Sequence, residues 1–449
     1  MVIAYKIDVK LYFIIKRRFG MNFFKRSFTV FLAILIGVFF TTANGFSKDT
    51  FRLGIVTFLS GAAAGPFGIP SKKAAELTVK ELNQGKVPAP YNKVGIAGKK
   101  IKVVWVDEAG SATKQVEEYR NLVQHKKVDA VIGYISSGHC LAIAPVAEEL
   151  GVLTVFYDCG TPRIFEENTY HYVFRTGLTA TIDSVGAARY IVDLKKNLKS
   201  ISAINQNYAW GQDSWHDFIS ALKDLKPNIK VKTVQFPKIF QGQYGAEISS
   251  LMMKPADFIH SSFWGGDLEA FILQGDARGL FEKQIPIFTC GEASMFRLAK
   301  QMPKGAIVGA RGPFGLYAPN NKLNRWFRKN YISKFGTSPT YPAYKMVQAI
   351  FGLKSAAEKA AMKKKNFTQE DIIKAFEYLK FKAPSGTVSM DLGKGHQAMQ
   401  GIAYGQYEIK NGKPTFVNVK WYPAKCVNPP DGMKSIDWIK NGMKGAKCN

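Results

Sequence analysis

The stretch DAVIGYISSGHC, residues 129–140, decides the fold. An apolar, β-branched run stops abruptly at three small residues, Ser136, Ser137 and Gly138. Such a run with such an end predicts a buried strand that leads into a helix. At that junction backbone N–H groups and hydroxyls can hold an anion, and we expect a carboxylate. A serine at a helix start can also serve only as an N-cap.

The same pattern repeats along the chain, because densely apolar segments alternate with segments that have apolar residues at helical spacing. The first set predicts strands at 51–58, 100–107, 128–134 and 152–157, with helices at 71–83, 113–125 and 139–150. The second predicts strands at 200–205, 229–236, 256–263 and 285–290, with helices at 180–195, 211–224, 244–253 and 267–279. The pattern predicts an α/β fold with two doubly wound parallel sheets.

The rest of the chain closes this architecture. Residues 320–380 return to helical patterns, and residues 400–422 predict a β-hairpin around Asn411-Gly412. A chain of 449 residues with 46% hydrophobic residues is long enough for two or more domains.

The N-terminus has the pattern of a secretory signal peptide. Lys25 and Arg26 precede the apolar run FTVFLAILIGVFF, residues 28–40, and small residues follow at Ala43 and Gly45. The run is shorter than the ~20 residues that span a bilayer, which disfavours a membrane anchor. Residues 1–45 are therefore expected to be a signal peptide with an upstream extension, and Met21 is a better-placed start. No cysteine follows the run to carry a lipid, so we expect a periplasmic protein.

The charge is strongly basic, with a formal net charge of +28. Residues 1–45 carry seven Lys/Arg and one Asp, which leaves +22 on the rest of the chain. The lysines are spread out and no nucleic-acid-binding motif accompanies them, so we expect no nucleic-acid partner. A Lys-rich composition or attraction to an anionic membrane surface accounts for the charge better.

Five cysteines fit an oxidising compartment without a disulfide scaffold. Cys426 and Cys448 bracket a loop-like tail and are the expected disulfide. Cys140, Cys159 and Cys290 are expected to be small buried residues near strand ends. The odd count leaves at least one cysteine unpaired.

Polar residues follow other predicted strands as well. One half of the chain offers Asp158, Cys159 and Thr161 in DCGT, which adds N–H donors and a hydroxyl. The other half offers Trp264 and Asp267 in WGGD, and Glu292 after strand 285–290. Because parallel sheets collect their loops at the carboxyl ends of strands, a ligand between the two halves is expected. Donors on one side and carboxylates on the other would suit a zwitterion.

The order and spacing of several segments carry a resemblance that covers roughly residues 51–422. The segments are RLGIVTFLSGAAAGPFG, AVIGYISSG, APVAEELGVLTVF, YVFRTG and YAWGQD. The chain is similar to the type I periplasmic solute-binding proteins of the branched-chain amino acid ABC transporter family. That resemblance implies capture of an amino acid, branched-chain or otherwise hydrophobic, and its delivery to a membrane permease by a monomer without cofactor or metal.

The resemblance also implies roles for single residues. Ser137 and Thr161 would hold the ligand carboxylate, Phe67 would cover the ligand, and Glu292 would meet the α-ammonium. Tyr208 and Trp264 lie where the second lobe would close. Phe67 replaces a hydroxylated aromatic residue, and Asp158 stands where the family has small neutral residues. With Asp267, Asp158 could favour a more cationic ligand or could face water.

The resemblance implies two lobes joined by a three-segment hinge. The N-terminal lobe would comprise residues 46–176 and 313–403, and the C-terminal lobe residues 177–312 and 404–449. The crossings are expected near 175–177, 311–313 and 403–405. Bound ligand would stabilise the closed form by its differential affinity for that form.

Other functions stay open at this point. An aromatic carboxylate, a short amide or urea would suit the same fold, and so would a ligand-sensing receptor. A hydrolase is the rival from another class, because Ser136, His139 and Cys140 lie close in sequence. Adjacency along the chain is not triad geometry, and no metal-binding or phosphate-binding motif is present.

Overall fold

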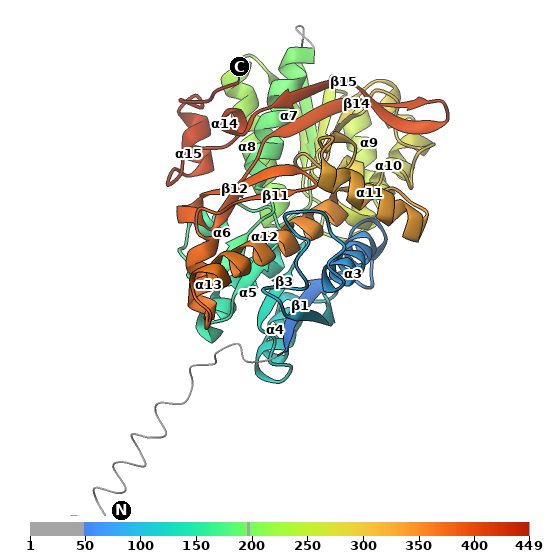
Figure 1. The fold of residues 1–449 in the computed structure, drawn as a ribbon. Helices are drawn as coiled ribbons and strands as arrows, with labels where there is room; N and C mark the ends of the chain where they lie inside the picture. The colour runs from blue at the N-terminus through green and yellow to red at the C-terminus, as the bar shows by residue number, and fades with distance from the viewer. Residues whose placement is uncertain (1–48, 195–197, 449) are drawn as a thin grey trace, which may run out of the picture. The chain divides into compact units, whose positions relative to one another are not determined.

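Two mixed sheets organise the protein (Figure 1). The computed structural model describes residues 49–194 and 198–448. The predicted signal peptide therefore lies outside the described residues. The first sheet has the order β11 (Lys380–Ala383), β12 (Gly386–Leu392), β13 (Gln397–Met399), β5 (Val173–Arg175), β4 (Thr154–Phe156), β3 (Ala130–Gly133), β1 (Thr50–Thr57) and β2 (Lys100–Asp107).

The second sheet has the order β15 (Lys413–Tyr422), β14 (Ile402–Lys410), β10 (Ile307–Gly309), β9 (Ile285–Phe288), β8 (Phe258–Ser261), β6 (Ser200–Ile204) and β7 (Lys230–Gln235). Pairing is parallel from β2 to β13 in the first sheet and from β7 to β10 in the second. Antiparallel strands close one edge of each sheet. The predicted α/β class with two doubly wound sheets is confirmed, with these antiparallel edges added.

Helices cover the sheets because the strands between them are apolar on both faces. Every residue of β3, β4 and β8 is buried. The helices around the first sheet are α3 (Ile69–Asn83), α4 (Ala112–Gln124), α5 (Ser137–Leu150), α6 (Arg163–Glu166), α11 (Lys322–Phe335), α12 (Tyr341–Lys363) and α13 (Gln369–Phe376). Around the second lie α7 (Ala180–Leu194), α8 (Ala209–Leu225), α9 (Gly245–Met253), α10 (Gly265–Ala277), α14 (Ala424–Val427) and α15 (Ser435–Lys440).

Short helical turns complete the chain: η1 (Ala64–Gly68), η2 (Leu280–Glu282), η3 (Gly291–Ala293), η4 (Gly315–Tyr317) and η5 (Gly393–Gly395). We call each sheet with its helices a lobe, the first and the second. The long helix α12 belongs to the first lobe, because it packs against α3 and α13.

The chain passes between the lobes three times. It leaves the first sheet after β5, returns to it after β10, and leaves it again after β13. The third crossing lies between Met399 and Ile402, earlier than the expected 403–405. Residues 403–405 are already part of β14, where they pair with β10 and β15. Strand pairing therefore sets this boundary.

The C-terminal elements pack on the second lobe. The predicted hairpin forms between β14 and β15, and its turn residues Asn411 and Gly412 have φ of 51° and 71°. Such positive φ values suit an Asn-Gly turn. After it, α14 packs against α7 and α15 packs against α8. A disulfide joins Cys426 to Cys448 across this tail.

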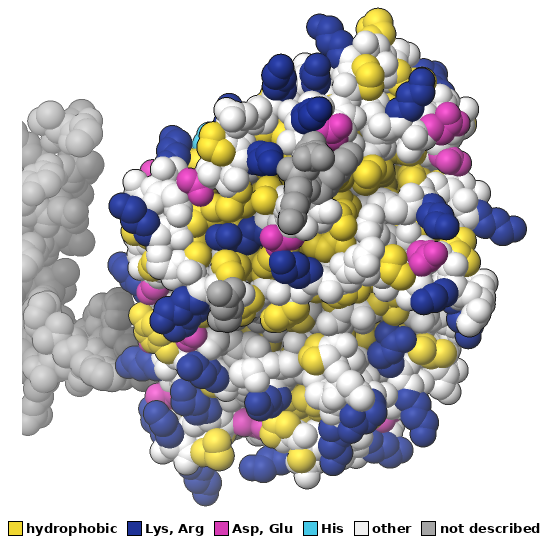
Figure 2. Space-filling view, turned by 90° about the horizontal axis from the view of Figure 1, so that it is seen from above, with side chains coloured by type: hydrophobic (Ala, Val, Ile, Leu, Met, Phe, Trp, Pro, Cys, Tyr) yellow, Lys and Arg dark blue, Asp and Glu magenta, His cyan; other side chains and the backbone are white. Residues whose placement is uncertain are grey.

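The surface agrees with a dispersed charge. Figure 2 shows Lys and Arg side chains spread over one face, with hydrophobic side chains between them and fewer Asp and Glu. Within residues 49–194 and 198–448, no helix has the length and apolar character that crossing a membrane requires.

Candidate ligand-binding site

A carboxylate of the protein itself binds the backbone at the end of β3, where residues 135–138 lead into α5. Glu108, directly after β2, is fully buried and accepts hydrogen bonds from the N–H groups of Ile135 and Ser136 at 2.8 Å. The Nδ1 atom of His139 lies 3.2 Å from the same carboxylate. Burial raises the pKa of Glu108 although these contacts oppose the shift. The Ser136 N–H is therefore engaged by Glu108 within the protein.

Ser137 joins two neighbouring strand ends. Its Oγ accepts hydrogen bonds from the N–H groups of Gly160 at 3.2 Å and Thr161 at 3.1 Å. A Cβ at Gly138 would lie 3.9 Å from the Tyr208 ring, so this helix start faces the second lobe. The DCGT loop and the start of α5 thus form one polar surface, as the strand order β3-β4 requires.

The same proximity joins two of the cysteines. Cys140 in α5 and Cys159 in the DCGT loop form a disulfide with a Cα–Cα distance of 6.4 Å. We expected them to be separate small buried residues, because the sequence alone does not show that β3 and β4 are parallel neighbours. The side chain of Cys159 is therefore committed to a bond. Cys290 is free and buried.

Asp158 lies in a buried ion-pair network. Its Oδ1 is 2.6 Å from both Arg311 Nη1 and Lys345 Nζ, and all three side chains are almost fully inaccessible. Arg311 also contacts Asp183 at 3.1 Å and stacks over Trp210, 4.2 Å from the ring centroid. Asp158 is therefore shielded from water, and its Oδ1 is already paired with two cations of the protein. Its second oxygen, Oδ2, has no hydrogen-bond partner among the described residues.

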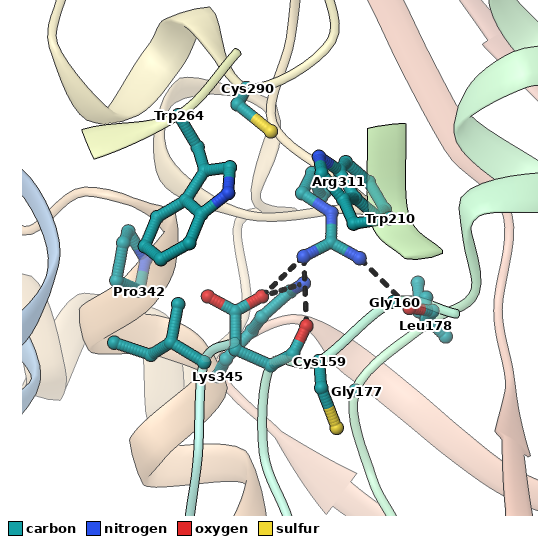
Figure 3. Close-up of polar contacts among 12 residues, drawn as sticks. Cys159, Gly160, Gly177, Leu178, Trp210, Trp264, Cys290, Arg311, Pro342 and Lys345 are labelled. Atoms are coloured by element: carbon teal, nitrogen blue, oxygen red, sulfur yellow. Dashed lines mark hydrogen bonds and ion pairs between the residues drawn. The ribbon is translucent and has the colours of Figure 1, made fainter. Parts of the chain in front are cut away.

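Charge and burial compete within this network. Burial and the Arg311 charge lower the pKa of Lys345 to about 8, although Asp158 opposes the shift. Burial alone would lower the pKa of Arg311, but Asp158 and Asp183 raise it overall. Figure 3 shows Arg311, Lys345, Trp264 and Cys290 arranged around one region at the lobe boundary. The sequence predicted a crossing between the lobes at residues 311–313, but it predicted neither the ion pairs of Arg311 nor any role for Lys345.

Aromatic side chains from both lobes meet at the same boundary. Trp264, after β8, packs edge-on against Phe67 from the first lobe, with ring centroids 5.2 Å apart. Its Nε1 donates a 2.7 Å hydrogen bond to the Tyr208 hydroxyl, at the start of α8. Phe58 and Phe240 also contact Trp264, at 5.8 and 5.3 Å. The structure thus brings Phe67, Tyr208 and Trp264 together and adds two rings that sequence reasoning missed.

Polar contacts also cross the boundary. The Thr161 hydroxyl donates to Asp213 Oδ2 at 2.7 Å, and Arg163 pairs with the other oxygen of Asp213 at 2.5 Å. Asp213 lies on α8, and it is the last residue of the YAWGQD segment. The sequence analysis quoted this segment for its resemblance to a family. The role of Asp213 in joining the two lobes could be recognised only from its contacts with Thr161 and Arg163.

The two carboxylates expected to meet an ammonium group have partners within the protein. Asp267 accepts hydrogen bonds from Gln206 Nε2 at 2.6 Å and from the Phe240 N–H at 2.7 Å. Glu292 is fully buried and accepts the N–H of Tyr341, the first residue of α12, at 2.7 Å. Burial raises the pKa of Glu292 to about 8, so its protonated form dominates at neutral pH.

Comparison with known proteins places this geometry in context. A family model described as periplasmic binding protein matches residues 50–413. A curated relative, an amino acid binding protein of Pseudomonas aeruginosa, is 24% identical over 168 residues. That match spans 37% of this chain and 43% of the relative, less than half its length.

Solved structures share the fold. A solute-binding protein of an ABC transporter from Rhodopseudomonas palustris, in complex with 3,4-dihydroxybenzoic acid, has a TM-score of 0.71 at 21% identity and covers 84% of this chain and 98% of its own. A leucine-, isoleucine-, valine-, threonine- and alanine-binding protein from Brucella ovis has a TM-score of 0.71 at 18% identity, covering 85% and 97%. At these identities the likeness establishes the fold alone.

Proposed function

Because the chain belongs to the periplasmic binding protein family, we propose that it is the solute-binding component of an ABC importer and captures a small organic acid between its lobes. The observation that carries the proposal is the meeting of Phe67 from the first lobe with Trp264 and Tyr208 from the second. Such rings supply apolar contact area with few rotamers to order, which suits a small ligand. The periplasm is the proposed location, and a membrane permease is the proposed partner.

The polar end of the ligand belongs at the Ser137 and Thr161 loops. Both lie at carboxyl ends of parallel strands, where loops of such sheets collect ligands. The two residues already share hydrogen bonds through Ser137 Oγ. A ligand carboxylate would compete for the Gly160 and Thr161 N–H groups, since a charged acceptor makes a stronger hydrogen bond than a hydroxyl.

An aromatic acid fits these contacts better than an amino acid. Four rings, those of Phe58, Phe67, Tyr208 and Phe240, meet Trp264 at the lobe boundary, whereas Asp267 already accepts two hydrogen bonds. Glu292 is held in its neutral form at neutral pH and therefore offers an ammonium group little charge. The solved relatives include binders of aromatic acids.

A hydrophobic or branched-chain amino acid is the second candidate ligand. It is favoured by the curated amino acid binding protein and by the branched-chain amino acid binders of the same fold. Glu292 follows β9 at the lobe boundary. An ammonium group beside it would favour the ionised carboxylate, so Glu292 would lose its proton when such a ligand binds. In either case the ligand favours lobe closure only by binding the closed form more tightly than the open form.

Isothermal titration of the purified protein with 4-hydroxybenzoate, benzoate, leucine and urea tests the proposal. We expect a benzoate or hydroxybenzoate to bind, and Trp264→Ala to weaken that binding at least tenfold. Trp421→Ala is the matched control, since this tryptophan is 49% exposed on β15. Binding of leucine alone would favour the second candidate. Binding that is indifferent to Trp264→Ala would overturn the proposed site.

A further inference from the structure

A chain of four polar side chains runs from α8 to α6 through the C-terminal tail (residues 423–448). Asp217 on α8 contacts Thr181 on α7, with 2.7 Å between Oδ2 and Oγ1. The Thr181 hydroxyl lies 2.7 Å from the Ser435 hydroxyl, at the start of α15. The Ser435 hydroxyl also bonds to Glu166 Oε1 on α6, and the Ser435 N–H donates to Oε2 at 3.0 Å. Two carboxyl groups are thus joined through two hydroxyls.

This chain of contacts crosses the lobe boundary. Its Asp217 and Thr181 end belongs to the second lobe, whereas Glu166 belongs to the first. Between them stands the tail, whose α15 packs against α8 (Figure 1). Asp213, one helical turn before Asp217, makes a neighbouring contact with Thr161 and Arg163 of the first lobe. The tail is therefore held between the lobes by Thr181 on one side and Glu166 on the other.

The three links of the chain need three hydrogens. A hydroxyl carries one hydrogen, so Thr181 and Ser435 supply two. If both carboxyl groups were ionised, Thr181 would donate to Asp217 and Ser435 would donate to Glu166. No hydrogen would then lie between the two hydroxyl oxygens, although their separation of 2.7 Å is that of an ordinary O–H···O bond. The complete chain therefore requires one further proton, on Asp217 or on Glu166.

The surroundings of Asp217 favour the proton on its side chain. Asp217 is 3% exposed, and within residues 49–194 and 198–448 no cationic side chain pairs with it. Burial raises the pKa of Asp217 to about 8, against the effect of the Thr181 contact, and the charges of Glu166 and Asp213 add to the rise. With the proton on Asp217, each link has a donor: Asp217 donates to Thr181, Thr181 to Ser435, and Ser435 to Glu166.

Other charged groups near Asp217 leave this assignment in place. From α6, Arg163 is engaged by Asp213, at 2.5 Å. From α15, Lys440 acts on His216, the exposed neighbour of Asp217. Burial also raises the pKa of Glu166, but its two contacts from Ser435 and the Arg175 charge oppose that rise. Glu166 is therefore the better anion of the pair.

We propose that Asp217 and Glu166 share one proton at neutral pH, and that this proton fastens the C-terminal tail between the lobes as a pH-sensitive latch. When the proton leaves, two negative charges stand at the ends of the chain and the Thr181–Ser435 link has no hydrogen. One hydroxyl must then turn away, so docking of the tail weakens as pH rises through about 8. The latch does not depend on which ligand the lobes bind.

The shared proton is tested by ¹³C NMR of the side-chain carboxyl groups of the purified protein between about pH 5 and pH 9.5. Asp217→Asn and Glu166→Gln assign the two signals by removing them. We expect one carboxyl group of the pair to be protonated at about pH 6.5 and to titrate near pH 8. Two ionised carboxylates at pH 6.5 would overturn the proposal.

The latch is tested by hydrogen exchange of the tail, followed by mass spectrometry at about pH 6.5 and pH 9 and corrected for the faster exchange of free peptides at high pH. We expect protection of α15 to fall at least tenfold between these values in the parent protein. Asp217→Asn should show no such fall, because its amide N–H can donate to Thr181 at either pH. Asp224→Asn, at an exposed aspartate of the same helix, is the matched control and should behave as the parent.

Thr181→Val removes the middle of the chain and keeps the test decisive even if Asp217→Asn fails to fold. It should leave α15 poorly protected at both pH values. Constant protection in the parent, or the parent's full pH dependence in Asp217→Asn or in Thr181→Val, would each overturn the latch.

Discussion

Replacing Glu292 with glutamine isolates the energetic cost of burying a carboxyl group at the lobe boundary. The side chain is fully buried, and its pKa is raised from 4.5 to about 8. Between those two values the unfolded chain has lost the proton that the folded protein still holds. Stability therefore falls as pH rises through this window and levels off above about pH 8.

The magnitude follows from the size of the shift. One pKa unit corresponds to about 1.4 kcal/mol, so the cost reaches about 3 kcal/mol at pH 7 and about 4–5 kcal/mol above pH 8. Glutamine bears no charge in either state, and its carbonyl oxygen can still accept the Tyr341 N–H. Glu292→Gln should therefore match the parent protein near pH 4.5 and exceed it in stability by an increasing margin as pH rises.

Urea unfolding of both proteins at about pH 4.5, 6 and 8 measures this difference. Glu117→Gln is the matched control, because Glu117 is exposed on α4, and its effect should not change with pH. A Glu292→Gln difference that stays flat, or that turns unfavourable towards pH 8, would refute the reasoning. It would mean that Glu292 is ionised in the folded protein and is available to an ammonium group, which would strengthen the amino acid candidate.

Three further perturbations have defined outcomes. Asp158→Asn removes the negative charge that pairs with both Lys345 and Arg311 and should lower the free energy of unfolding by about 3–5 kcal/mol in urea titrations; an unchanged midpoint would contradict the ion-pair network. The double variant Cys426→Ala/Cys448→Ala opens a loop of sequence separation 22 and should cost about 3 kcal/mol, measured in the same way, and no loss would argue against the bond. Thr161→Val removes the 2.7 Å hydrogen bond from the Thr161 hydroxyl to the Asp213 carboxylate on α8. It should weaken the affinity for the bound acid several-fold in calorimetric titrations. Tighter binding would show that this hydrogen bond does not stabilise the closed form.

Local patterns in the sequence were sufficient for most of the architecture. The alternation of apolar strands and amphipathic helices predicts the central parallel strands, because each strand is buried by helices on both faces. The Asn411-Gly412 turn predicts the hairpin, because both residues tolerate positive φ. The exact residues of the third crossing were not predictable, because pairing of β14 with both β10 and β15 fixes where that strand begins.

The site was less predictable, because its contacts join residues far apart in sequence. Asp158 and Arg311 are 153 residues apart, so one sequence offers no local signal for their pairing. The contact of Glu108 with Ser136 spans 28 residues and depends on the strand order β2-β1-β3. Phe67 and Trp264 come together because each follows a strand end at the lobe boundary, which the sequence did indicate.

A crystal structure of the protein with bound benzoate tests the central claim most directly. We expect the ring to contact Phe67 and Trp264 and the carboxylate to accept N–H groups of the loop that contains Thr161. Benzoate found only away from these residues, or absent from the crystal at saturating concentration, would contradict capture of an organic acid between the lobes.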